Sequence, residues 1–411
     1  MNLAGKHLLL GLTGSIACYK SAELTRLLTQ AGATVQVTMT ESAAQFITPI
    51  TMQALSGHPV YISQYDARID NNMPHIALSR RADAIVIAPA SADFIAKLAT
   101  GLCDDLLSTL AIARDCPLLI VPAMNRQMWQ NSATQRNVVQ LRCDDIIVLD
   151  PDAGSQACGE IGNGRMLEPQ AIYEAIIALL HPKKLSGKRI LITAGATFEP
   201  IDPVRGITNR SSGKMGFALA RAAAQAGGRV HLIAGLVELA TPWGVSRENI
   251  QTAQQMYNSV MATIADIDIF IAVAAVGDWR AAQVSEHKLK KAAGQPLPPL
   301  HFVENPDILA SVAALPTPPY CVGFAAESSE LSINGEAKRR RKNVPLLIGN
   351  LGPKTFGKDG NEVVLFDKTG STPLPLADKQ SLARTLVDEI AQRVLGNTLH
   401  DPGAMHQLSD C

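Results

Sequence analysis

The sequence predicts an α/β protein of two units, each built on a mostly parallel sheet with helices on both faces. Apolar strands alternate with helical stretches through both halves, and unbroken apolar strands are typical of parallel sheets that are buried on both sides. In each half the first strand runs through a glycine-containing turn into a helix, at residues 7–16 and 189–197. The length of 411 residues also exceeds what one hydrophobic core usually contains.

The first half begins with this strand and turn. Residues 16–31 then have apolar positions at helical spacing, and residues 33–40 read as the next strand. Buried strands are predicted at 84–88 and 117–121, separated by a helical stretch over 92–113. Because ligands of open parallel sheets bind at the carboxyl ends of the strands, functional residues are expected in the segments that follow them.

A short polar segment, residues 181–188, predicts a linker, and the alternation then restarts. Strands are predicted at 189–194, 229–234, 267–276, 320–324 and 345–349, and helices near 214–227, 252–265, 306–314 and 379–395. The last residues show no periodic pattern. We therefore assign residues 1–180 to the first unit, 181–188 to the linker, 189–398 to the second unit and 399–411 to a disordered tail.

Composition excludes several classes of partner. Lys+Arg and Asp+Glu both total 37, so no net charge draws the chain to nucleic acid or to an anionic membrane. No apolar run approaches the ~20 residues that span a bilayer, and the N-terminus lacks the pattern of a signal peptide. The seven scattered cysteines form no CxxC pair. These features favour a cytoplasmic protein that acts on small molecules, without a disulfide framework or a zinc site.

The two glycine turns suit phosphate groups but match neither common nucleotide motif. Neither turn completes G-x-G-x-x-G, so a dinucleotide site is not supported. Ser212-Gly213-Lys214-Met215 superficially resembles a P-loop. However, Thr208 stands in place of the first loop glycine, and Met215 replaces the residue that would bind Mg²⁺. We therefore reject the P-loop interpretation.

Three polar or reactive residues stand out in the first half. His75 precedes an apolar strand, Asn125 directly follows one, and Cys158 lies in a glycine-rich loop. Singly, each has a structural interpretation: a satisfied histidine, a turn-forming asparagine and an incidental cysteine. Their segments together resemble the FMN-dependent cysteine decarboxylases, phosphopantothenoylcysteine decarboxylases in particular. The matching segments are Gly11-x-Thr13-Gly14-Ser15-Ile16-Ala17, the His75 segment, Pro122-Ala123-Met124-Asn125-x-x-Met128-Trp129 and Ala157-Cys158-Gly159-Glu160-x-Gly162-x-Gly164-Arg165-Met166.

This resemblance implies a flavodoxin-like, Rossmann-like unit with FMN as cofactor. His75 would assist oxidation of the substrate thiol, Asn125 would hold the substrate carboxylate, and Cys158 would supply the proton of the reductive step. The implied flavin contacts are Gly14, Ser15, Thr40, Ser91 and Ala123. The chemistry is coherent, because an amide nitrogen cannot form a Schiff base with pyridoxal phosphate. Oxidation of the thiol to a thioaldehyde instead provides an acceptor for the electrons that CO₂ leaves behind.

The second half carries polar clusters that resemble phosphopantothenate–cysteine ligase. By spacing alone, the basic run over 338–342 also fits a solvated helix face. The shared segments are Ile192-Thr193-Ala194-Gly195-x-Thr197, Asp202-Pro203-Val204-Arg205, Asn209-x-Ser211-Ser212-Gly213-Lys214-Met215-Gly216, Ala274-Ala275-Val276-x-Asp278, Lys288-x-Lys290-Lys291, Asn305-Pro306-Asp307-Ile308, Gly323-Phe324-Ala325-Ala326-Glu327 and Lys338-x-x-x-Lys342-Asn343. The resemblance implies that CTP, with Mg²⁺, activates 4'-phosphopantothenate as an acyl-cytidylate that cysteine then attacks.

The resemblance also assigns roles in this second, Rossmann-like unit. Asn209 would bind the pantothenate carboxylate or the acyl intermediate, and Lys288 would assist the attack on the cytidylate. The implied nucleotide-binding residues are Asp278, Lys288, Phe324, Lys338 and Lys342. No metal ligands are assigned. A homo-oligomer is implied, with trimeric packing of the flavin halves and dimeric packing of the ligase halves.

Two alternatives follow from the sequence. Ala196, Arg210 and Leu351 depart from the ligase pattern, and the departures at Ala196 and Leu351 leave open that only one half turns over. The other alternative is a regulatory flavoprotein like the phosphatase-binding relatives. The joint presence of Asn125 and Cys158, with a complete second half, argues against it.

Overall fold

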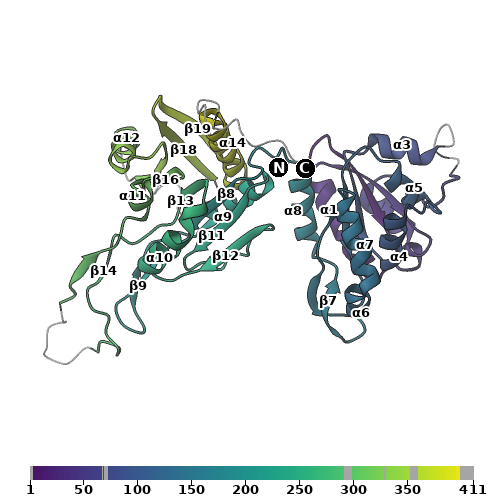
Figure 1. Cartoon of the computed structure of the whole chain (residues 1–411), viewed down its shortest axis with the longest axis horizontal. Coiled ribbons are helices and arrows are strands. Elements are labelled where there is room, and N and C mark those ends of the chain that lie inside the picture. Colours follow the sequence, from purple (N-terminus) through teal and green to yellow (C-terminus); the bar gives the residue numbers. More distant parts are fainter. Residues whose placement is uncertain are drawn as a thin grey trace. The chain divides into compact units, whose positions relative to one another are not determined.

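The computed structural model describes residues 3–66, 68, 73–290, 299–327, 330–351 and 360–398, so the tail predicted over 399–411 lies outside the described residues. The chain divides into two compact units, Met1–Leu180 and His181–Cys411 (Figure 1). Among the described residues, every helix is too short or too polar to cross a lipid bilayer.

The first unit is built on a five-stranded parallel sheet in the order β2-β1-β3-β4-β5, followed in the chain by a separate antiparallel hairpin, β6–β7. The strands are β1 (His7–Leu12), β2 (Thr34–Met39), β3 (Ala84–Ala90), β4 (Leu118–Pro122), β5 (Ile147–Val148), β6 (Asp152–Ser155) and β7 (Ile161–Arg165). The helices are α1 (Cys18–Gln30), α2 (Pro49–Ser56), α3 (Pro74–Arg81), α4 (Ala92–Thr100), α5 (Leu106–Ile112), α6 (Arg126–Gln130), α7 (Ser132–Cys143) and α8 (Pro169–Leu180).

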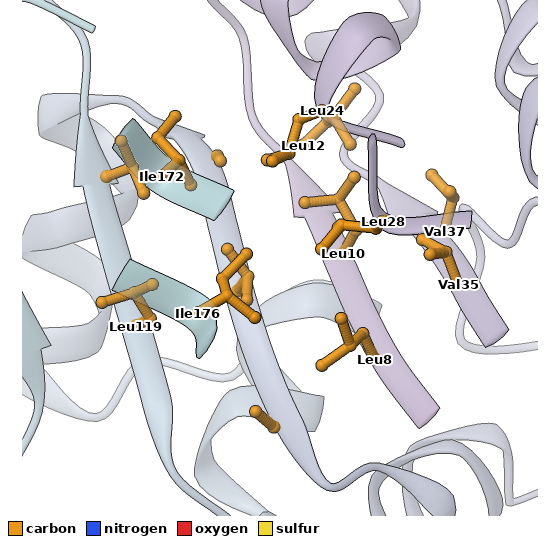
Figure 2. Close-up of a cluster of buried hydrophobic side chains, with 14 of the residues drawn as sticks. Leu8, Leu10, Leu12, Leu24, Leu28, Val35, Val37, Leu119, Ile172 and Ile176 are labelled. Atoms are coloured by element: carbon orange, nitrogen blue, oxygen red, sulfur yellow. The ribbon is translucent and has the colours of Figure 1, made fainter. Parts of the chain in front are cut away.

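Side chains of β1 enter hydrophobic cores on both faces of this sheet, as the unbroken apolar strand predicts. Leu10 and Leu12 lie beside Leu24 and Leu28 of α1 on one face (Figure 2). Leu9 belongs to the core on the opposite face. The predicted α/β fold with a covered parallel sheet is therefore confirmed in this unit.

The single helix predicted over 92–113 is wrong in one respect, because the structure divides it into α4 and α5. Gly101 ends α4 with a left-handed backbone (φ +71°), which glycine adopts without strain. Asp105 then caps α5: its side chain accepts a hydrogen bond from the Ser108 N–H, and the Ser108 hydroxyl accepts one from the Asp105 N–H in return. These are ordinary helix stop and start signals that the apolar pattern masks.

The second unit is built on an eight-stranded sheet in the order β12-β11-β8-β13-β16-β17-β18-β19. Six strands are parallel, and β18 and β19 add antiparallel to one edge. The sheet strands are β8 (Arg189–Ala194), β11 (Arg229–Ala234), β12 (Val245–Asn249), β13 (Ile269–Ala272), β16 (Tyr320–Glu327), β17 (Leu346–Leu351), β18 (Gly360–Asp367) and β19 (Gly370–Asp378). The helices are α9 (Lys214–Gln225), α10 (Ala253–Thr263), α11 (Ile308–Ala313), α12 (Leu331–Lys342) and α14 (Lys379–Thr398).

Two small antiparallel pairs accompany this sheet, β9 (Phe198–Pro200) with β10 (Gly206–Thr208) and β14 (Trp279–Ala281) with β15 (Phe302–Glu304). The strand predicted over 267–276 is too long, because β13 ends at Ala272. The residues that follow it are irregular and line the cavities described below. The predicted mostly parallel sheet is confirmed.

Candidate active sites

A cavity of about 660 Å³ opens at the carboxyl ends of β1, β3 and β4 in the first unit. The predicted contacts Gly14, Ser15, Ser91 and Ala123 line it. Its wall is completed by apolar side chains and by the β6–β7 hairpin; the other lining residues are Ile16, Ala17, Tyr19, Lys20, Ala92, Met124, Asn125, Met128, Ser155, Gln156, Ala157, Cys158, Gly164, Arg165 and Met166.

The turn that enters α1 forms one end of this cavity. A Cβ atom on Gly14 would lie 2.7 Å from the Ser42 Cβ, so the turn has no room for a larger residue. The Ser15 hydroxyl accepts a hydrogen bond from the Ala17 N–H at 3.2 Å, one residue before α1 begins. Peptide N–H groups at the start of a helix attract anions, so this end of the cavity suits a phosphate.

Asn125 and Cys158 meet in the wall of the same cavity. Asn125 caps α6, and its Oδ1 accepts the Gln127 N–H at 2.8 Å. This bond directs the Asn125 Nδ2 toward the hairpin, 3.4 Å from the Cys158 Sγ. Nδ2 also donates to the Glu160 Oε2 at 2.8 Å, and the Gln127 Nε2 donates to the Glu160 Oε1 at 3.1 Å. These two hydrogen bonds hold the pKa of the Glu160 carboxyl below its ordinary value.

The hairpin that carries Cys158 contacts the chain just after β4. The Met124 N–H donates to the Gly164 carbonyl at 2.9 Å, and a Cβ on Gly164 would lie 2.4 Å from the Met124 oxygen. Gly164 also has φ +136°, so only glycine fits there. Cys158 itself is an exposed free thiol in the turn.

Lys20 anchors the base of the same hairpin, although sequence reasoning gave it no role. Its side chain is 4% exposed, and its Nζ donates to the Met166 carbonyl at 2.7 Å and to the Glu168 Oε1 at 2.9 Å. Arg165 pairs with the same Glu168 oxygen at 2.6 Å. The lysine bonds keep the pKa of the Glu168 carboxyl low. The only sequence signal is that Lys20 falls on the buried face of α1, between Ala17 and Leu24.

His75 and Thr40 are not among the described residues that line this cavity. His75 is the second residue of α3, which Pro74 begins, and its side chain is half-buried. Thr40 follows β2, where its hydroxyl accepts the Ala43 N–H at 3.2 Å. The structure thus brings Asn125 and Cys158 together, but it does not bring His75 to the cavity of its own chain.

Two adjoining cavities open at the carboxyl ends of strands of the second unit. The first, of about 550 Å³, contains Asn209 and Lys338, and the second, of about 590 Å³, contains Asp278 and Lys342. Phe324 lines both. Four of the predicted nucleotide-binding residues, Asp278, Phe324, Lys338 and Lys342, are therefore distributed over two cavities that share a wall.

The first of these cavities reaches the N-terminus of α9. Gly213 directly precedes the helix with φ +72°, and a Cβ there would lie 2.7 Å from the Val237 Cγ1. The Asn209 Nδ2 donates to the carbonyls of Ala275 and Val276, at 3.1 and 3.2 Å. These bonds fix the orientation of the Asn209 amide beside the start of the helix.

Two lysines of α12 are paired with carboxylates at these cavities. Lys338 lies 3.2 Å from Glu327, and Lys342 lies 3.0 Å from Asp307. Burial acts to raise the pKa of the Asp307 carboxyl, but the Ala310 N–H and Lys342 outweigh it, so the pKa is lowered. Asn305 contributes to the same cavity, donating through Nδ2 to the Gly277 carbonyl at 2.8 Å. The roles of Asn305 and Asp307 could not be assigned from the sequence.

Lys288 lines neither cavity among the described residues. The backbone of its neighbour Leu289 makes two hydrogen bonds. The Leu289 N–H donates to the Asp202 Oδ2 at 3.1 Å, and the Leu289 carbonyl accepts from the Arg205 Nη2 at 2.7 Å. Asp202 is 2% exposed and pairs with Arg205 at 2.7 Å. The Arg205 hydrogen bonds hold the pKa of the Asp202 carboxyl far below its ordinary range. The sequence motif Asp202-Pro203-Val204-Arg205 therefore positions the segment that carries Lys288.

No set of three or more His, Cys, Asp or Glu side chains suited to a metal occurs within the described parts of the chain.

Comparison with known proteins agrees with the two-unit architecture. The family model "Flavoprotein" matches residues 1–181, and the model "DNA/pantothenate metabolism flavoprotein C-terminal domain" matches residues 185–394. The coenzyme A biosynthesis bifunctional protein CoaBC of Vibrio vulnificus is 47% identical, over 96% of this chain and 99% of its own length. The chain belongs to the CoaBC family of bifunctional coenzyme A biosynthesis proteins.

Other relatives are similar along the whole chain or along one unit. The CoaBC protein of Escherichia coli is 46% identical over 96% of this chain and 98% of its own. A solved structure of a PPC decarboxylase mutant complexed with pantothenoylaminoethenethiol is 34% identical, covers 42% of this chain and 96% of its own, and has a TM-score of 0.38. This CoaBC-family chain is an enzyme of coenzyme A biosynthesis, with a flavoprotein half for decarboxylation and a second half for ligation.

Proposed function

We propose that residues 189–398 join 4'-phosphopantothenate to cysteine with CTP, through an acyl-cytidylate, and that residues 1–180 decarboxylate the product to 4'-phosphopantetheine with FMN. Residues 181–188 link the two. The observation that supports this most is the contact of the Asn125 amide with the Cys158 thiol on a largely apolar cavity. The amide made by one half is the substrate of the other.

The cavity of the first unit fits FMN. Its volume, the apolar side chains of Ile16, Met124 and Met128, and the cramped Gly14 turn at the start of α1 suit a planar ring system that ends in a phosphate. Bound FMN would take two electrons from the substrate thiol and return them after CO₂ is lost. Gly14, Ser15, Ser91 and Ala123 would contact it, with Thr40 bracing the chain behind the turn.

The chain's own residues would position the substrate and move its proton. The Asn125 amide would donate to the substrate carboxylate until the C–C bond breaks. Cys158 would then protonate the enethiolate carbon, a role that suits a thiol, since thiols are mostly protonated at neutral pH. Its place on a hairpin turn allows it to approach the substrate from the open side.

His75 would complete the site from a second copy of the chain. It does not reach the cavity of its own chain, and the exposed apolar side chains Ile16 and Tyr19 stand at the cavity, 62% and 63% accessible. A neighbouring subunit would cover them, in a homo-oligomer with trimeric flavin halves and dimeric ligase halves. The seven cysteines without a CxxC pair favour a cytoplasmic location.

In the ligase half, two cavities with a common Phe324 wall suit a nucleotide and an acid that must react with each other. Both substrates are anionic, and Lys338 and Lys342 would offset their repulsion. Mg²⁺ would arrive with the triphosphate, because this ion is usually held through phosphates and one or two carboxylates, here with Asp278 nearby. Asn209 would hold the acyl group, and Lys288 would assist the attack of cysteine.

One incubation tests the whole proposal. The purified chain with 4'-phosphopantothenate, cysteine, CTP and Mg²⁺ is expected to be yellow and to yield 4'-phosphopantetheine, CO₂, CMP and pyrophosphate by mass analysis. A colourless protein that binds no added FMN would remove the decarboxylase claim. Separate addition of 4'-phosphopantothenoylcysteine tests the first half alone, which distinguishes a fully active chain from one with a degenerate half or a regulatory role.

A further inference from the structure

The carboxylate of Glu160 binds the side-chain amide of Asn125, the group proposed to bind the substrate carboxylate. The Asn125 Nδ2 donates to the Glu160 Oε2 at 2.8 Å, and its distances to the Cys158 Sγ and the Gln156 Oε1 are longer, at 3.4 and 3.5 Å. The orientation of this amide is fixed, because its Oδ1 accepts the Gln127 N–H. The shortest bond of the Asn125 amide nitrogen is therefore made to a carboxylate that belongs to the protein itself.

A substrate carboxylate competes for the same donor. An amide nitrogen has only two N–H groups, and two carboxylates on one of them repel each other. The Cys158 thiol lies two residues from Glu160 in the same turn, so the displaced carboxylate and the thiol must move as part of one segment. Gly159, between them, has φ +85°, and a Cβ at this position would have no other atom within 4 Å, so the turn has open space around it.

We propose that Glu160 is an internal substitute for the substrate carboxylate, which occupies Asn125 in the empty enzyme and is displaced when the substrate binds. This inference rests on the proposed role of Asn125. Glu160 is a positioning residue: it keeps the Cys158 turn against Asn125 until the substrate arrives. Gln127, whose side chain is exposed, retains the displaced carboxylate through its Nε2.

The exchange affects substrate and product differently. 4'-Phosphopantothenoylcysteine must displace Glu160, whereas 4'-phosphopantetheine lacks the carboxylate and leaves the Glu160–Asn125 bond intact. Removal of the Glu160 charge therefore strengthens the binding of the substrate alone. A residue that merely stabilised the hairpin would change the binding of both ligands together.

The test compares two constants in the full-length, FMN-loaded enzyme: KM for 4'-phosphopantothenoylcysteine and the inhibition constant of 4'-phosphopantetheine. Glu160→Ala and Glu160→Gln are expected to lower KM, by about five-fold for the alanine variant and less for glutamine, while the inhibition constant stays within about two-fold. Asp152→Asn removes the same charge from the start of the same hairpin and is expected to change neither constant. An unchanged or raised KM, or a parallel shift of both constants, overturns the proposal.

Asn125→Leu separates this inference from the function beneath it. This variant is expected to weaken the binding of the substrate much more than the binding of the product. If it weakens both equally, Asn125 does not hold the carboxylate, and the proposed role of Asn125 and the inference fail together. If Asn125→Leu discriminates between the ligands but Glu160→Ala does not, only the displacement of Glu160 is refuted.

Discussion

The two units place their cavities at the same end of the same kind of sheet, but they assemble them differently. In the first unit, Asn125 and Cys158 come from two different elements, and the Asn125 Nδ2 already lies 3.4 Å from the Cys158 Sγ. In the second, the candidate residues line two adjoining cavities, and Lys288 stands apart on a segment that Asp202 positions. Two of the lysines there are paired with the protein's own carboxylates, Lys338 with Glu327 and Lys342 with Asp307.

The difference follows from what each site receives. A resident cofactor favours a site in which catalytic side chains already lie together before the substrate arrives, so that the exchange of Glu160 for the substrate carboxylate is a local movement of one hairpin turn. A ligase that binds two free anions needs strong positive charge only when they are present. Pairing each lysine with a carboxylate limits the repulsion within the empty site, and the incoming phosphates can replace those partners.

Cys158→Ser tests the preassembled site and is expected to have the largest effect. Formation of 4'-phosphopantetheine should fall by about 10²–10⁴-fold, the usual contribution of a positioned proton donor, while CO₂ is still released until the bound FMN is fully reduced. Mass analysis should detect the oxidised, decarboxylated thiol. Cys103→Ser, which alters another exposed thiol, is the matched control. Undiminished product formation would refute the role of Cys158.

Lys288→Gln tests the distributed site. We expect amide formation to fall by about 10²-fold, because the lysine assists only the attack of cysteine, while CTP-dependent release of pyrophosphate persists. The acyl-cytidylate should therefore accumulate and be detectable by mass. Lys184→Gln, at a lysine that pairs with Asp388 instead, serves as control. Loss of pyrophosphate release would place Lys288 in the first half-reaction and contradict this assignment.

Asp202→Asn tests whether the distributed site depends on how its parts are positioned. The change loosens the segment that carries Lys288 and leaves Lys288 itself unaltered. The change weakens the bonds to Arg205 and to the Leu289 N–H, so the acyl-cytidylate should again accumulate, with amide formation about ten-fold slower. Thermal unfolding of the variant monitors its folding. Equal losses in both half-reactions would show that Asp202 supports the unit generally and does not position Lys288.

Glu336→Gln has the smallest expected effect, a small decrease in the free energy of unfolding. Hydrogen bonds from Arg339 and Arg340 on the same helix lower the pKa of the Glu336 carboxyl to about 2. A depressed folded-state pKa stabilises the protein above the unfolded value, near 4.5, and this stabilisation is lost as the pH falls toward 2. The variant should be less stable at pH 7 by ~0.5 kcal/mol, and the difference should shrink at pH 3. Chemical unfolding at both pH values measures it, and a large change in KM for CTP would mean that Glu336 also acts in the cavity.

The sequence predicted those parts of the fold in which local pattern and burial agree. Continuous apolar runs identified the central parallel strands of both sheets, but they missed β5, which has only two residues, and β12, which is mostly polar. They could not identify β19, whose Pro373 and Pro375 oppose a strand assignment and are tolerated because β19 forms the sheet edge. The β6–β7 hairpin was missed as well, since its residues are glycine-rich and mostly exposed.

The same limit applies to the sites. Asn125 and Cys158 lie in long, distinctive motifs, and the structure places them together; their roles stay predictions. The functions of Glu160 and Asp202 depend on partners 35 and 87 residues away, to which no local pattern points. His75 stays a prediction too, because its proposed partner is another copy of the chain.

The buried lysine of α1 limits how this sequence can change over evolution. Lys20 joins α1, at the end of the cavity proposed for the phosphate, to the base of the hairpin, over 146 residues of sequence. An apolar residue at this position would leave the Met166 carbonyl without its donor and Glu168 with Arg165 alone. Neutral replacements should therefore arise in combination, with Lys20 and Glu168 changing together. Descendants of this chain would inherit the pair as one unit, although its members lie at opposite ends of the domain sequence.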